Sequence, residues 1–208
     1  MIADKYIEQH SFPLPEVLDW LERETHLRTN HGRMLSGPVL GRLLITFSKM
    51  VNPKRILEIG TFTGYSAICL AQGLKEEGRL DAVERNDELE SLILEGFSRA
   101  ELEDKVSLHI GSALDIVPAL DEAYDIVYID GNKREYCLYY DLVFDKVPEG
   151  GYILADNVLW SGKLFEEPLP QDAQTQEIAK FNSMVAADKR VESFILPLRD
   201  GLNIIRKK

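Results

Sequence analysis

Acidic side chains end several apolar runs in this sequence. Glu58 lies in RILEI, Glu84 ends LDAVE, Asp130 ends YDIVYID, and Asp156 is followed by Asn157 in GYILADN. Apolar runs of this length are typical of buried parallel strands, whose carboxyl ends meet at the edge of a sheet where ligands bind. These acids are therefore the candidate functional residues, and their charge suits a cationic ligand.

A glycine-containing loop follows the first of these runs, in ILEIGTFTGYSA. A P-loop needs a Lys-Ser/Thr pair after its glycines, and none follows here. The dinucleotide-binding fingerprint needs glycine at its first, third and sixth positions, which hold Gly60, Phe62 and Tyr65. The spacing excludes both kinds of phosphate-binding loop, and with them an NAD-dependent dehydrogenase.

The loop contains Glu58, Gly60 and Gly64, and Glu84 ends the next apolar run. An acid at the end of a second strand is placed to accept hydrogen bonds from both hydroxyls of a ribose. Glu58 suits a positive charge and not a phosphate. A ribose, a positive charge and no phosphate describe S-adenosylmethionine. The alternative is that Glu84 is a surface acid and the glycines form an ordinary turn.

Asp130, Asp156 and Asn157 end two consecutive strands of the expected sheet. Adjacent strands lie about 4.8 Å apart, so the three side chains can converge on one ion. The set holds oxygen ligands without His or Cys, which favours Mg²⁺, Ca²⁺ or Mn²⁺ over zinc. The alternative is that these side chains cap the helices that follow.

The elements that must position these residues alternate along the chain. The pattern predicts helices over 15–27 and 38–50, joined by an irregular connector, and from residue 54 onward strand and helix alternate. The expected strands are 55–59, 80–84, 106–110, 124–130, 151–156, 191–198 and 202–208, and the expected helices 64–76, 86–100, 112–120, 133–146 and 172–187. This order predicts an α/β fold with a doubly wound, mostly parallel seven-stranded sheet. The Asp-Gly turn before the last strand predicts an antiparallel C-terminal hairpin at the sheet edge.

LEIGTFTGYSA, the WSG after Asp156-Asn157 and the strand-end acids together resemble the metal-dependent O-methyltransferases typified by the caffeoyl-CoA and catechol enzymes. The resemblance runs from about residue 34 to the C-terminus. It implies a Rossmann-like methyltransferase fold and a single domain, 1–208, in which 1–50 form a helical extension and lid on an α/β core. The cofactor contacts that it implies are Met34, Ser36, Glu58, Gly60, Thr61, Ser66, Glu84, Ala113 and Asp130.

The resemblance also implies a catalytic role for Asp130 and Lys133. Methyl transfer is an in-line displacement, so the acceptor oxygen must be deprotonated and aimed at the methyl group. A divalent ion bound to two neighbouring hydroxyls does both, and Lys133 matches the family lysine that removes the proton. Many relatives carry Asp-Ala-Asp-Lys where this chain has Asp130-Gly131-Asn132-Lys133, so Asn132 adds no negative charge beside the cofactor.

The chain as a whole is acidic. It has 24 basic and 35 acidic residues among 208, for a net charge of −11, which argues against nucleic acid as a partner. We expect no secretory signal, no membrane-spanning run, a cytoplasmic location and a homodimer. Cys69 and Cys137 both fall in expected helices, which predicts free thiols.

The sequence gives the least information about the methyl acceptor. An irregular stretch after Asn157 contains Trp160 and Phe165, and loops at such a rim set specificity. We expect the acceptor to be a small catechol-like aromatic that could stack on Trp160. One alternative keeps the chemistry and methylates a hydroxylated base of transfer RNA. Another is a non-catalytic cofactor-binding protein, which has no need of the metal residues or Lys133.

Overall fold

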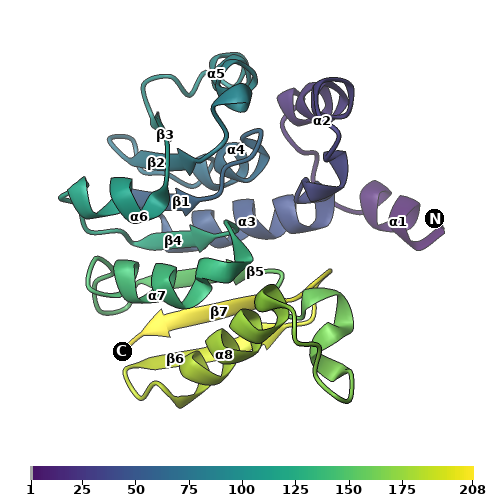
Figure 1. Ribbon diagram of the computed structural model, residues 1–208. Coiled ribbons are helices and arrows are strands. Elements are labelled where there is room, and N and C mark those ends of the chain that lie inside the picture. Colours follow the sequence, from purple (N-terminus) through teal and green to yellow (C-terminus); the bar gives the residue numbers. More distant parts are fainter. Residues whose placement is uncertain (1) are drawn as a thin grey trace.

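The computed structural model describes residues 2–208 and the side chains from Tyr6 onward. Its sheet has seven strands in the order β3-β2-β1-β4-β5-β7-β6 (Figure 1). The strands are β1 (Arg55–Ile59), β2 (Arg79–Glu84), β3 (Val106–Ile110), β4 (Ile126–Ile129), β5 (Tyr152–Asp156), β6 (Val191–Leu196) and β7 (Leu202–Lys207). Strands β1 to β5 are parallel, and β7 lies antiparallel between β5 and β6. The predicted fold class is confirmed.

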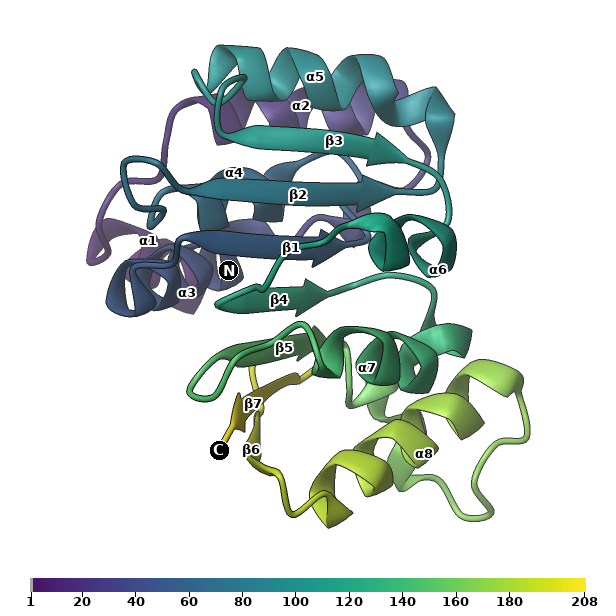
Figure 2. The same cartoon turned by 90° about the vertical axis from the view of Figure 1, so that its left-hand side faces the viewer.

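Helices cover both faces of the sheet. The α-helices are α1 (Ile2–Gln9), α2 (Val17–Arg28), α3 (Gly37–Val51), α4 (Tyr65–Ala71), α5 (Glu90–Arg99), α6 (Ala113–Ile116), α7 (Tyr136–Phe144) and α8 (Ala173–Ala187). One buried cluster joins the sheet to α2, α3, α4 and α5, and a second joins it to α6, α7 and α8. Figure 2 shows β1 to β4 running in one direction, so their carboxyl ends share one edge.

Several expected helices are shorter than predicted. The helix expected over 64–76 ends at Ala71, and Gly73 just beyond it packs against the backbone of α3, where a side chain would collide with Ser48. The helix expected over 112–120 is split into α6 and a 3₁₀ turn at Val117–Ala119, since Pro118 has no N–H for a continuous helix. The helices expected over 86–100 and 133–146 each begin with a 3₁₀ turn, at Asp87–Leu89 and Lys133–Glu135 respectively. The strand expected over 124–130 is only Ile126–Ile129.

The segment Gly32–Val51 is long and apolar enough, by length and composition alone, to span a membrane, with a mean hydropathy of 1.2. Its α3 portion packs against α4 and the sheet, with Leu40, Leu44 and Ile45 buried. A buried helix of a globular core has the same composition, and this segment also contains Arg42.

Cys69 and Cys137 are free and buried in α4 and α7, as predicted. Burial raises the pKa of the Cys137 thiol to about 12, so it stays protonated at neutral pH. Neither cysteine is a reactive thiolate.

Candidate active site

Four carboxylates come from the carboxyl ends of four neighbouring strands: Glu84 on β2, Glu58 on β1, Asp130 just past β4, and Asp156 on β5. Glu58 is fully buried, Asp156 is 4% exposed and Glu84 is 9% exposed. Among the described residues, the single ion pair to any of the four is the one between Lys133 and Asp130. This carboxylate row therefore lies in a poorly solvated place with one cationic partner, which favours cationic ligands.

The row lies on one face of the sheet because of strand periodicity. Ile56 and Leu154 belong to the buried cluster beneath α3 and α4. Glu58 and Asp156 lie two residues further along the same strands, so their side chains are on the same face of the sheet. Asp130 continues the line of β4, because its N–H donates to the carbonyl of Ile59 at 2.9 Å. Local strand geometry thus brings side chains from distant parts of the sequence to one edge.

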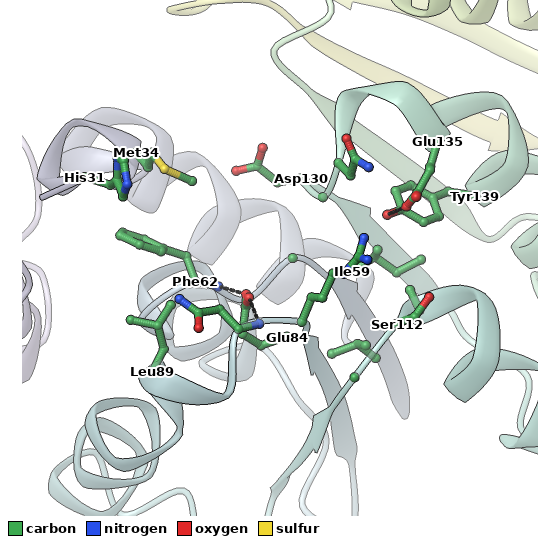
Figure 3. Close-up of a pocket in the computed structure, with 18 residues that line it drawn as sticks. His31, Met34, Ile59, Phe62, Glu84, Leu89, Ser112, Asp130, Glu135 and Tyr139 are labelled. Carbon is green, nitrogen blue, oxygen red and sulfur yellow. Dashed lines mark hydrogen bonds between the residues drawn. The ribbon is translucent and has the colours of Figure 1, made fainter. Parts of the chain in front are cut away.

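A cavity of about 300 Å³ opens at this edge. In Figure 3, His31, Met34 and Phe62 lie on one side, Ser112 and Tyr139 on the other, and Asp130 between them. Of the expected cofactor contacts, those that line the cavity are Met34, Gly60, Glu84, Ala113 and Asp130. Those whose side chains do not line it are Ser36, Glu58, Thr61 and Ser66.

Glu84 is held in place by the loops around it. Its Oε2 accepts from the Phe62 N–H at 2.7 Å and its Oε1 from the Asn86 N–H at 2.8 Å (Figure 3). Phe62 adopts a φ of 52°, in the left-handed region. Each carboxylate oxygen keeps a further lone pair for a ligand in the cavity.

The first loop brings the ends of β1 and β4 into contact at Gly60. Gly60 has a φ of 93°, and a Cβ there would collide with the backbone carbonyl of Asp130. Glycine is therefore required at this position by both conformation and space.

Glu58 lies beneath this loop without a hydrogen-bond partner for either carboxylate oxygen. Burial raises the pKa of Glu58 to about 7. The Ser66 and Thr61 hydroxyls lie close enough to lower this pKa, but neither reaches hydrogen-bonding geometry, and the Thr61 hydroxyl is itself buried without a partner. An unpartnered buried acid is costly, and a ligand with a positive charge would relieve that cost.

Asp130, Asp156 and Asn157 meet where β4 and β5 end. Burial and the charge of Asp130 raise the pKa of Asp156 to about 6. The Asp156 carboxylate is oriented by the Tyr128 hydroxyl, 3.0 Å from Oδ2, and by the Asn157 N–H, 2.9 Å from Oδ1. No group of three His, Cys, Asp or Glu side chains that could hold a metal ion occurs in the part of the chain described. Asp130 and Asp156 are neighbouring carboxylates that repel each other, an arrangement that suits a cation.

Lys133 links this group to α7. Its Nζ donates to Asp130 Oδ1 at 2.6 Å and to the Tyr136 hydroxyl at 2.6 Å. The Tyr136 hydroxyl in turn donates to the main-chain carbonyl of Asp156 at 2.8 Å and more weakly to that of Ile129 at 3.3 Å. Tyr136 is fully buried, so it fixes the lysine against the ends of both strands.

The cavity also contains residues that sequence reasoning did not select. Phe62, Asn86, Ser112, Glu135 and Tyr139 line it, and the Tyr139 hydroxyl donates to Glu135. Asn86 and Ser112 could have been predicted from their positions, because each lies two residues after the end of a strand, β2 and β3 respectively. Asn132, noted for replacing an acid, lines the cavity too, and its side chain accepts from the Arg134 N–H.

The loop after β5 is anchored to the turn between β6 and β7. Val158 N–H donates to Gly201 O at 3.1 Å and Leu159 N–H to Asp200 O at 2.8 Å. Trp160 is partly buried against the cluster beneath α7 and α8, and its indole N–H has no partner. Phe165 is 72% exposed. Trp160 thus contributes mainly to packing, whereas the Phe165 side chain is exposed to solvent.

Comparison with known proteins agrees with this geometry. Residues 8–208 match the family model described as O-methyltransferase. Caffeoyl-CoA O-methyltransferase 2 of Populus trichocarpa is 32% identical, over 80% of this chain and 72% of its own. The O-methyltransferase of Bacillus cereus in complex with SAH superposes with a TM-score of 0.91 at 26% identity, covering 100% of this chain and 98% of that one. TomG of Streptomyces achromogenes in complex with SAM superposes with a TM-score of 0.93 at 27% identity, covering 100% of this chain and 96% of that one. The chain belongs to the O-methyltransferase family.

Proposed function

We propose that this protein is an S-adenosylmethionine-dependent, divalent-cation-dependent O-methyltransferase that methylates a hydroxyl of a small catechol-like aromatic. The carboxylate row carries the proposal, because four largely buried acids with one lysine among them suit a sulfonium cofactor and a metal ion. The SAM and SAH complexes of the two bacterial relatives support the cofactor. The names of the plant relatives support a phenolic acceptor.

In this proposal the cofactor occupies the cavity of Figure 3. Glu84 holds the ribose hydroxyls, and Ala113 lies beside the adenine. Met34, Gly60 and Asp130 line the remaining wall, while Glu58, Thr61 and Ser66 attract the positively charged end from beneath the loop. Glu58 and Thr61 do not line the cavity, so in this proposal their buried oxygens act on the positive charge of the cofactor at a distance and not through hydrogen bonds.

Asp130, Asp156 and Asn157 would hold the divalent cation. When bound, the cofactor supplies an electrophilic methyl group, and the cation lowers the pKa of a coordinated hydroxyl and orients it. Tyr128 and the Asn157 N–H fix the Asp156 carboxylate in advance, so the site loses little conformational freedom when it is filled.

Lys133 would accept the acceptor's proton at Nζ. The 2.6 Å contact with Asp130 Oδ1 occupies the lysine atom that would take the proton. The base role therefore requires that this carboxylate oxygen be engaged elsewhere, as it would be if Asp130 held a cation. Tyr136 keeps Nζ in position while this exchange occurs.

Other expectations stay part of the proposal. They are a single domain with residues 1–50 as extension and lid, a homodimer, and a cytoplasmic location. A hydroxylated transfer RNA base is not favoured as acceptor, because the carboxylate row adds negative charge where phosphates would approach.

The experiment that tests the proposal is a transfer assay with methyl-labelled S-adenosylmethionine. Catechol, caffeoyl esters and transfer RNA are offered as acceptors, with Mg²⁺ and with a chelator. Cation-dependent labelling of catechol or the esters supports the proposal. Labelling of transfer RNA alone would assign the acceptor to the other candidate, and no labelling of any acceptor would remove the proposed activity.

A further inference from the structure

One end of the cavity in Figure 3 is bounded by the start of α6 and the start of α7. Ala113 is the first residue of α6, Glu135 directly precedes α7, and Tyr139 lies one turn further along that helix. Figure 3 shows the Glu135 and Tyr139 side chains next to each other at this end. The proposed function places the ribose of the cofactor at Glu84 and its adenine beside Ala113. The polar groups at this end therefore face the edge of a base.

The Glu135 carboxylate is held in place by Tyr139. The Tyr139 hydroxyl donates to Glu135 Oε2, and the tyrosine is 4% exposed. Burial and this bond raise the pKa of Tyr139, so its hydroxyl keeps its proton and stays a donor. The ring also packs on Gly131, where a Cβ would lie 3.0 Å from Tyr139 Cε2. The absence of a side chain at Gly131 thus lets the tyrosine lie close to the chain that follows β4.

The polar side chains that line the cavity near Glu135 differ in what they can offer a base. Arg85 can only donate, and the Ser112 hydroxyl can either donate or accept. The Asn132 amide oxygen already accepts from the Arg134 N–H, so one of its lone pairs is in use. Oε1 of Glu135 accepts from no donor within residues 6–208. Glu135 is therefore the strongest acceptor at this end, since a charged acceptor forms the stronger bond.

We propose that Glu135 accepts a hydrogen bond from the amino group of the cofactor's adenine and so selects a base that has a donor at this position. Tyr139 is the positioning residue for the carboxylate. The inference rests on the proposed function, because it concerns how the same site recognises its cofactor. Adenine has a donor on C6, whereas hypoxanthine has an acceptor oxygen there. A carboxylate fixed by Tyr139 attracts the first and repels the second.

The test is a calorimetric titration of the full chain with S-adenosylhomocysteine and with S-inosylhomocysteine, its 6-oxo counterpart. The wild type should bind S-adenosylhomocysteine at least about tenfold more tightly. Glu135→Gln supplies an amide that can present either its oxygen or its NH₂ group, so this preference should be lost as S-inosylhomocysteine gains affinity. Glu135→Ala supplies no donor, and S-inosylhomocysteine should bind it less tightly than it binds Glu135→Gln.

Tyr139→Phe tests the positioning role, because it keeps the ring on Gly131 and removes the bond to Glu135. The preference for S-adenosylhomocysteine should fall in part. Glu149→Gln is the matched control, because Glu149 is an exposed glutamate just before β5, at the opposite edge of the sheet from the cavity. It removes the same charge from the chain and should keep the full preference.

Equal affinity of the wild type for the two ligands overturns the inference, without need of any variant. A Glu135→Gln protein that keeps the wild-type preference overturns it too. Methyl transfer to catechol is measured in parallel. Turnover without an adenine preference leaves the proposed function standing and removes this inference, whereas an adenine preference without methylation of any acceptor does the reverse.

Discussion

The Lys133 ammonium lies 2.6 Å from the Asp130 carboxylate and 2.6 Å from the Tyr136 hydroxyl. Asp130 belongs to the proposed metal ligands, and Tyr136 bonds to the main chain of Asp156, so the lysine contacts Asp130 directly and is joined to Asp156 through Tyr136. The lysine and a metal ion are therefore competitors for the charge of Asp130. Removing Lys133 and removing the metal should have different consequences.

Lys133→Met removes the base and keeps most of the side-chain length. We expect kcat to fall by about 10² to 10⁴, the usual effect of losing a general base. Metal affinity should stay level or rise, because a positive charge has left Asp130. Steady-state kinetics with metal titration measure both, and higher pH should restore part of kcat. Full kcat at neutral pH with unsubstituted catechol would show that Lys133 only neutralises Asp130.

Tyr136→Phe removes a hydroxyl that joins Lys133 to the carbonyl of Asp156. The free energy of unfolding should fall by about 1–3 kcal/mol, since buried polar groups lose their partner. We expect kcat to fall 10- to 100-fold because Nζ loses its fixed position, while the Kd of the cofactor is unchanged. Urea unfolding and kinetics measure the two effects.

Tyr140→Phe is the matched control for that variant. Tyr140 lies one turn further along α7, and its hydroxyl bonds to Asp188, away from the carboxylate row. The free energy of unfolding of Tyr140→Phe should fall by a similar amount, and its kcat should be unchanged. If both variants lose the same kcat, the effect of Tyr136 comes from the packing of α7 and not from its hydroxyl.

The fold was predictable because its main signals are local. Apolar runs such as RILEI and the Asp-Gly turn before β7 identify strands and a hairpin without tertiary information. Boundaries depend on packing, and so they were less accurate: α4 ends where Gly73 meets α3, a contact that cannot be read from the residues of α4.

The candidate site was only partly predictable for the same reason. The position of Glu84 and Asp130 at strand ends follows from the pattern, and both line the cavity. Tyr136 was not selected, because a tyrosine in an apolar helix looks like a core residue until its hydroxyl is located. Ser36, an expected cofactor contact, lies at the start of α3 and does not line that cavity.

Glu84→Gln should weaken cofactor binding by about 1.5–3 kcal/mol, the contribution of a charge-assisted hydrogen bond. Glutamine is preferred to alanine because alanine would also leave the N–H groups of Phe62 and Asn86 without an acceptor. Calorimetric titration with S-adenosylmethionine measures the change. Glu88→Gln removes an exposed charge nearby and should have no effect. Unchanged affinity in Glu84→Gln would remove the residue from the cofactor site.

Glu58→Gln should change how stability depends on pH. Burial raises the pKa of Glu58 from 4.5 to about 7, so between these values the folded state retains a proton that the unfolded state has released. The stability of the wild type should therefore fall as pH rises through this window, by roughly 2–3 kcal/mol from Glu58. Urea unfolding of the wild type and of Glu58→Gln from pH 4.5 to 8 gives the slope of unfolding free energy against pH for each. The difference between the two slopes reports Glu58, because the contributions of all other groups cancel. Parallel curves would mean that folding does not shift the pKa of Glu58.

The cation that the carboxylate row is proposed to bind is the centre of this account, and chelation tests it most directly. Protein treated exhaustively with EDTA is assayed for transfer of a labelled methyl group to catechol, before and after Mg²⁺, Mn²⁺ or Ca²⁺ is restored. We predict no transfer after chelation, recovery with at least one of these ions, and no recovery in Asp156→Ala, whose cofactor affinity should change little. Undiminished transfer by the chelated wild type would contradict the account.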